Sequence, residues 1–146
     1  MSLQSLRNEI KQKANPEKAK LLQRFFKTGK GQYGEGDIFL GITVPESRRL
    51  AIKYTHLPLK DIELLLSSKI HEERLIALLL LVHNYKKNPE KRKEIFDFYL
   101  SNTKHINNWD LADLSCHKIV GDYLLDKDRG ILYKLSKSSN LWERRI

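Results

Sequence analysis

The chain has 146 residues, of which 40% are hydrophobic and 31% charged, so its length and composition suit one folded domain with a core. A single cysteine excludes a disulfide framework and a cysteine-rich zinc site, and the longest apolar run, residues 75–82, is too short to span a bilayer. The net charge of +9 fits a polyanionic partner, most often nucleic acid, and equally well a solvated surface with an excess of lysine. We expect a basic, soluble, cytoplasmic protein.

The first part of the chain predicts two short amphipathic helices, residues 3–14 and 17–28, separated at Asn15-Pro16. The second is expected to expose its basic side chains and to turn its large apolar ones inward. The basic set is Lys18, Lys20, Arg24 and Lys27, and the apolar set is Leu21, Leu22, Phe25 and Phe26. Residues 1–60 hold 12 basic and 5 acidic side chains, whereas residues 61–146 hold 15 and 13.

Residues 29–44 form a glycine-rich loop, with five of the seven glycines of the chain. One interpretation is a mobile connector, and this is the one we favour from the local pattern. The other is a loop whose backbone approaches a phosphate chain closely. The glycine spacing fits neither a P-loop nor a dinucleotide-binding fingerprint.

The rest of the chain predicts helices and no strand, so the fold class is all-α. A helix over residues 45–54 carries Arg48, Arg49 and Lys53. It is followed by helical hairpins, with segments at residues 59–67 and 71–86, 89–101 and 108–125, and 128–137 and 141–146.

An imperfect internal repeat relates residues 67–75 to residues 138–146, an offset of 71, with the similar segment 107–113 between them. Steps of this size are typical of an α-solenoid of HEAT-like helical hairpins, which we expect to form a single domain over residues 1–146. In this register His71, Trp109 and Trp142 are equivalent, as are Arg74 and Arg145. Leu75, Asp113 and Ile146 form a third equivalent set.

Trp109 and Asp113 are four residues apart and project from one side of a helix, partly off its apolar stripe. Taken singly, Trp109 could be a core aromatic and Asp113 a solvated or lysine-paired carboxylate. Asp110 is well placed to accept hydrogen bonds from amides of the first helical turn. His117 is expected to be partly buried and hydrogen-bonded, and Cys116 to be a small core residue.

The five histidines show no metal-ligand spacing beside carboxylates, so we predict neither a metal nor a cofactor.

Three segments together resemble the DNA alkylation repair family, the HEAT-like alkylpurine DNA glycosylases. Residues 33–45 with Arg48 look like the N-terminal signature of that family. Residues 107–113 and 141–146 are similar to its two internal motifs, in the same order. The resemblance covers essentially the whole chain. It implies excision of cationic N3- and N7-alkylated purines from double-stranded DNA, without a protein pocket for the base.

Carried over residue by residue, the resemblance implies that Asp113 is the catalytic carboxylate and that Trp109 packs on the DNA backbone beside the lesion. Arg145 would hold a phosphate near the lesion, with Arg144 as the alternative if the alignment shifts by one. The residues expected to contact DNA are Trp142, Arg144, Tyr33, Arg48, Arg49 and Lys53.

Family members continue for several helices beyond the motif that ends this chain. We therefore expect a truncated solenoid with an exposed C-terminal apolar face, open to association with a partner. Two other functions stay open: a non-catalytic HEAT module that binds nucleic acid, and a protein-binding scaffold.

Overall fold

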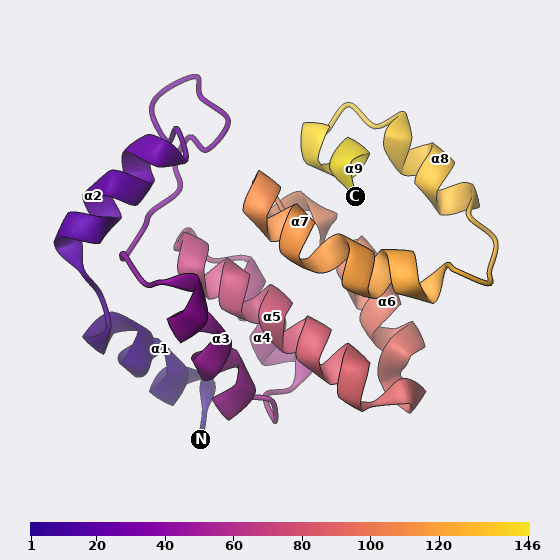
Figure 1. Ribbon diagram of the computed structural model, residues 1–146, viewed down its shortest axis with the longest axis horizontal. Coiled ribbons are helices and arrows are strands. Elements are labelled where there is room, and N and C mark those ends of the chain that lie inside the picture. Colours follow the sequence, from indigo (N-terminus) through magenta and orange to yellow (C-terminus); the bar gives the residue numbers. More distant parts are fainter. The chain divides into compact units, whose positions relative to one another are not determined.

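A computed structural model describes all of residues 1–146, and helices joined by loops make up the fold (Figure 1). The α-helices are α1 (Leu3–Gln12), α2 (Pro16–Phe25), α3 (Val44–Lys53), α4 (Leu59–Leu66), α5 (His71–Lys87), α6 (Arg92–Ser101), α7 (Trp109–Cys116), α8 (Gly130–Ser136) and α9 (Leu141–Arg145). Two short 3₁₀ helices, η1 (Pro89–Lys91) and η2 (Thr103–His105), and a π-helical turn, η3 (His117–Gly121), complete the set. There is no strand, only one isolated parallel bridge between Ile38 and Ile70. The all-α prediction is confirmed.

The chain divides into two compact units, Met1–Leu80 and Leu81–Ile146, and each has its own buried side chains. In the first unit the fully buried apolar residues include Leu6, Ile10, Ile62, Leu65, Leu66 and Ile76. In the second they include Tyr99, Ile106, Leu111, Ala112, Ile119 and Val120. None of the helices combines the length and the apolar composition that a membrane span needs.

Side-chain caps explain where several helices begin. Asn15 accepts from the amide of Lys18 and Pro16 follows it, so α2 starts at the dipeptide that the sequence marks. Thr43 and Glu46 form a capping box at the start of α3. These local signals account for the agreement between expected and observed helices.

The prediction that Leu21 and Phe25 turn inward on α2 is wrong. Their side chains are 65% and 63% exposed, and α2 contains no fully buried residue. The side of the helix that packs carries Phe26, just past its end, whose ring stacks on that of Phe39 with centroids 4.9 Å apart. Leu21 and Phe25 lie on the neighbouring face, because four large apolar residues make a stripe wider than one packing face can cover.

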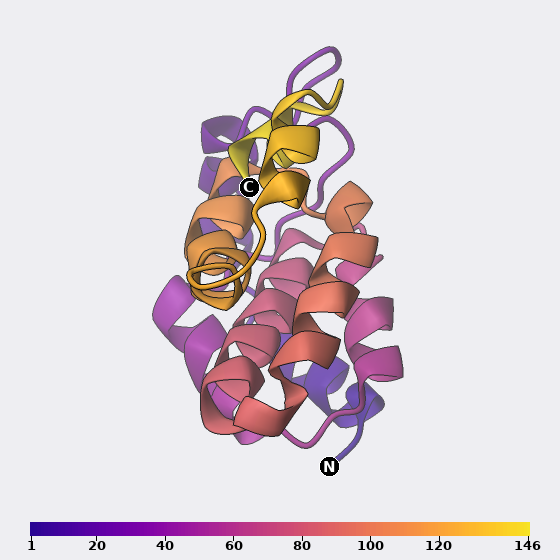
Figure 2. The same ribbon diagram turned by 90° about the vertical axis from the view of Figure 1, so that its right-hand side faces the viewer.

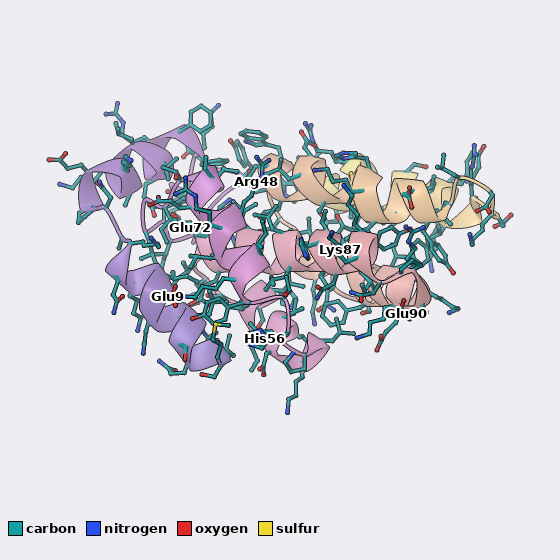
Figure 3. All side chains as sticks on the ribbon, turned by 60° about the horizontal axis from the view of Figure 1, so that its bottom comes forward. Glu9, Arg48, His56, Glu72, Lys87 and Glu90 are labelled. Atoms are coloured by element: carbon teal, nitrogen blue, oxygen red, sulfur yellow. The ribbon has the colours of Figure 1, made fainter.

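Part of the glycine-rich loop is held firmly by α5, contrary to the favoured interpretation of a mobile connector. The buried carboxylate of Glu72 accepts hydrogen bonds from the backbone amides of Leu40, Gly41 and Ile42 at 2.8–3.3 Å. Figure 3 labels Glu72 on this helix. The loop therefore uses its amides to bind a carboxylate of its own chain, which satisfies buried donors that would otherwise be costly.

Gly41 is the residue that allows this loop to lie against the start of α2. Its φ is +84°, and an added Cβ would lie 2.2 Å from the carbonyl oxygen of Asn15. Gly36 has a nearly identical φ of +83° but nothing within 4 Å of an added Cβ. The two glycines thus share a backbone conformation and differ in available space.

Replacing each glycine by alanine separates these two effects. Gly36→Ala should lower the free energy of unfolding by about 1–2 kcal/mol, the cost of a left-handed backbone for an L-residue. Gly41→Ala should lower it at least twice as much, because the methyl group also collides with backbone. Urea denaturation of both variants measures the difference. Equal losses would contradict the close approach at Gly41.

Candidate active site

Helix α7 carries the central residues of the site, and its start is fixed by Asn108. The buried Asn108 side chain accepts from the amide of Trp109 at 2.8 Å. Asp110, also buried, accepts from the amide of Leu111 at 2.8 Å, which agrees with the helix-start role expected for it. Ala112 and Cys116 are buried on the inner side of the helix. Asp113 therefore lies on the outer side, exposed to solvent.

Helix α9 has only five residues, and neighbouring side chains hold it in place. Asn140 accepts from the amide of Trp142 at 2.9 Å and caps the helix. Glu143 accepts from the hydroxyl of Thr103 at 2.6 Å and also from the hydroxyl of Ser138. These contacts tie α9 to η2 and to its own preceding turn, and α9 packs beside α7 (Figures 1 and 2).

Two matching sets of hydrogen bonds correct the repeat register by one residue. Arg74 donates to the carbonyl of Ser68, and Arg144 donates to the carbonyl of Ser138, each at 2.7 Å. The hydroxyls of Ser68 and Ser138 also accept the amide two residues later. The structural offset is therefore 70 residues, not 71, and Arg74 corresponds to Arg144 rather than to Arg145.

The corrected register makes Asp113 and Arg145 equivalent. Each is the fifth residue of its helix, because α7 begins at Trp109 and α9 begins at Leu141. Leu75 is the fifth residue of α5. Equivalent positions on neighbouring, similarly started helices face each other, which accounts for the contact between the two charged side chains.

Asp113 and Arg145 form a two-pronged ion pair. Arg145 donates through Nε to Oδ1 of Asp113 and through a terminal nitrogen to Oδ2, both at 2.7 Å. The side chains are 42% and 47% exposed. Hydrogen bonding from Arg145 holds the pKa of Asp113 below its ordinary value of 3.8, and the nearby charges of Arg145 and His117 act in the same direction. Asp113 is therefore a carboxylate at neutral pH.

The two tryptophans are half-buried at the first turns of α7 and α9. Arg144 is exposed, and its donation to Ser138 turns it back toward its own loop. The structure therefore brings Arg145, and not Arg144, to Asp113. Tyr33, Arg48, Arg49 and Lys53 belong to the first unit and are all exposed. Of these, Lys53 is paired with Glu9 at 2.6 Å.

Two other side chains, Cys116 and His117, complete the comparison with expectation. Cys116 is buried, as predicted, and burial raises the pKa of its thiol. His117 is exposed rather than partly buried, because it lies one helical turn after Asp113 on the outer side of the same helical run. No group of three or more His, Cys, Asp or Glu side chains is placed to hold a metal ion. Tyr133 and Leu141 are exposed apolar residues of α8 and α9.

Sequence reasoning missed the positioning role of Glu143. The sequence held part of the signal, since Glu143 follows Asn140 by three residues, which is the spacing of a capping box at a helix start. The contact with Thr103 spans 40 residues and had no local signal.

Comparison with known proteins identifies one family. The sequence model for a family described as DNA alkylation repair enzyme matches residues 6–146. No curated protein and no solved structure is significantly similar to the chain.

Removing the guanidinium should change the titration of Asp113. In Arg145→Gln we expect the pKa of Asp113 to rise toward 3.8, because the strongest stabiliser of its charged form is lost. The ion pair accordingly contributes stability at neutral pH that is lost as the pH falls through the lowered pKa. Carboxyl-carbon NMR titration measures both values. Asp126, whose pKa Lys127 lowers, should not change and serves as the internal control. An unmoved Asp113 would contradict the pairing.

Proposed function

The chain belongs to the DNA alkylation repair enzyme family, and from this premise we propose that it is a DNA glycosylase. It would hydrolyse the N-glycosidic bond of cationic N3- and N7-alkylated purines in duplex DNA. The observation that carries the proposal is the exposed Asp113 carboxylate paired with Arg145 beside two half-buried tryptophans. A charged acid next to a phosphate-binding group suits a reaction on DNA that develops positive charge.

The proposed reaction needs little proton donation from a general acid. An N-alkylated purine already carries a positive charge and leaves as a neutral base when its bond to the deoxyribose breaks. Positive charge then develops on the sugar, and a fixed carboxylate stabilises it. Asp113 does not need Arg145 to be ionised for this task, because its ordinary pKa of 3.8 already lies well below neutral pH. Water attacks the sugar, and Asp113 can orient that water and accept its proton.

Arg145 would exchange one partner for another when DNA binds. A guanidinium donates a fork of hydrogen bonds to a carboxylate or to a phosphate with similar geometry. A phosphate next to the lesion therefore competes with Asp113 for Arg145 and frees the carboxylate to face the sugar. Because the pair is nearly half exposed, separating it has a small free-energy cost.

Trp109 and Trp142 would supply the apolar surface of the site. Each lies within the first two residues of a helix that also presents one charged member of the pair. A flat aromatic side chain can pack on deoxyribose and exclude water from the reacting centre, which strengthens the effect of the carboxylate. Trp142 and Arg144 remain proposed DNA contacts, as do Tyr33, Arg48, Arg49 and Lys53.

The repeated loop before α5 and α9 supports the proposal that the helices form a HEAT-like solenoid. Ser68 and Ser138 make the same hydrogen bonds, and Arg74 and Arg144 close the same turn. Such repeats line a surface with equivalent helices. An enzyme of this kind would act on chromosomal DNA in the cytoplasm, without a cofactor.

Base release tests the proposed reaction. The protein should release 7-methylguanine from methylated duplex DNA, and Asp113→Asn should lower the rate by about 10²- to 10³-fold, the loss typical for one electrostatic stabiliser of the transition state. Asparagine preserves the shape of the side chain and keeps one oxygen that can accept from Arg145, but it removes the negative charge. Chromatography of the released base measures the rate.

The matched control is Asp97→Asn, which removes an exposed carboxylate paired with Lys93 and should leave the rate unchanged. Equal rates for Asp113→Asn and the unaltered protein would overturn the assignment. Duplex binding without release by either protein would favour the non-catalytic nucleic-acid-binding module.

A further inference from the structure

The second unit contains a basic cavity of about 500 Å³ that the proposed reaction does not use. Its walls come from α5, from the start of α6 and from the π turn that follows α7. The lining residues are Val82, Tyr85, Lys86, Arg92, His117, Lys118 and Asp122. Figure 3 labels Lys87 and Glu90 at the nearby corner where α5 leads to α6.

The cavity begins one helical turn from the candidate site. His117 lines it and lies four residues after Asp113 on a continuous run of helical backbone. The two side chains are close enough that the charge of His117 helps to lower the pKa of Asp113. A linear polymer bound at Asp113 can therefore extend into the cavity.

Positive charge dominates the lining. Lys86, Arg92 and Lys118 face a single carboxylate, Asp122. Asp122 accepts the hydroxyl of Tyr85 at 2.8 Å and lies 4.0 Å from the guanidinium of Arg92. The negative charge of Asp122 is therefore already compensated by Tyr85 and Arg92, two residues that line the cavity.

The three cationic side chains of the lining differ in how strongly other residues hold them in place. Arg92 is held by a hydrogen bond from its Nε to the Tyr85 carbonyl at 3.3 Å and by the ring of Tyr85, 5.0 Å from the guanidinium carbon. Lys86 and Lys118 are exposed and form no ion pair. Arg92 therefore forms a fixed wall, and the two lysines supply ammonium groups that can reach an anion.

The π turn sets the position of two lining residues. Residues His117–Gly121 insert a wider turn into the helix, and π turns of this kind are uncommon and often occur at functional sites. Ile119 and Val120 are fully buried by it, while His117 and Lys118 are exposed. The backbone irregularity thus places a cation at the cavity that lies beside Asp113.

We propose that this cavity binds the phosphodiester backbone of the DNA strand that continues past the candidate site, through Lys86 and Lys118. The proposal rests on the proposed function for the identity of the anion. Its contacts would be independent of base sequence, because Tyr85 is buried beneath Arg92 and the only carboxylate is already bonded. A free nucleotide, which needs a surface for its base, fits this lining less well.

The salt dependence of binding to an undamaged duplex tests the proposal. We expect the double variant Lys86→Gln/Lys118→Gln to reduce the slope of log Kd against log salt by about 2, since each lost phosphate contact removes about one unit. Affinity near physiological salt should fall about ten-fold or more. The matched control is Lys93→Gln/Lys127→Gln, which removes two lysines already paired with Asp97 and Asp126 and should leave the slope nearly unchanged.

Three outcomes would overturn the inference. The first is an unchanged slope in the Lys86/Lys118 variant, and the second is no duplex binding by the unaltered protein. The third is tight binding of deoxyadenosine monophosphate that the same variant abolishes, since this would assign the cavity to a free nucleotide. Because the duplex is undamaged, the inference can fail while base release persists, and base release can fail while the slope changes as expected.

Discussion

The side-chain caps of the short helices are the constraint on which the candidate site depends. Asn108 and Asn140 each accept a backbone amide at the start of a helix and thereby fix the rotation of α7 and α9. A five-residue helix has almost no intrinsic stability, so α9 relies on its cap and on the contacts of Glu143. With both starts fixed, Asp113 and Arg145 occupy the same position in their helices. Their side chains form hydrogen bonds between α7 and α9.

Two aspartate–arginine pairs in this protein show how burial separates a structural role from a chemical one. Arg74 lies 2.6 Å from Asp37, and both side chains are 5% exposed. Removing one partner there would leave a buried charge uncompensated, so the pair is a permanent part of the fold. The pair of Asp113 and Arg145 is far more exposed, and solvent or a phosphate can replace either partner at little cost. Of the two arginines, only Arg145 can therefore exchange its carboxylate partner for a phosphate.

Local signals in the sequence predicted most of the fold. Asn15-Pro16 and Thr43 with Glu46 mark helix starts through contacts within a few residues, and such contacts survive in the folded chain. The repeat register was less certain because a Ser-Ser dipeptide occurs at both 67–68 and 138–139, which permits alignments that differ by one residue. Only the hydrogen bonds of Ser68 and Ser138 select between them.

The features that the sequence did not predict depend on contacts between distant segments. The exposure of Leu21 and Phe25 follows from which face of α2 meets Phe39, and no local pattern encodes that choice. The π turn at His117 likewise has no residue signature in this chain. Asp113 was identified by resemblance to a family, and its pairing with Arg145 emerged only from the geometry of α7 and α9.

A transition-state mimic tests the central claim, that Asp113 stabilises positive charge on the sugar, without requiring turnover. One duplex would carry a cationic pyrrolidine in place of a single deoxyribose, and a second would carry the neutral tetrahydrofuran of the same shape. We predict that the protein binds the cationic duplex at least about ten-fold more tightly, and that Asp113→Asn removes this difference. Equal affinity of the unaltered protein for the two duplexes would contradict the account.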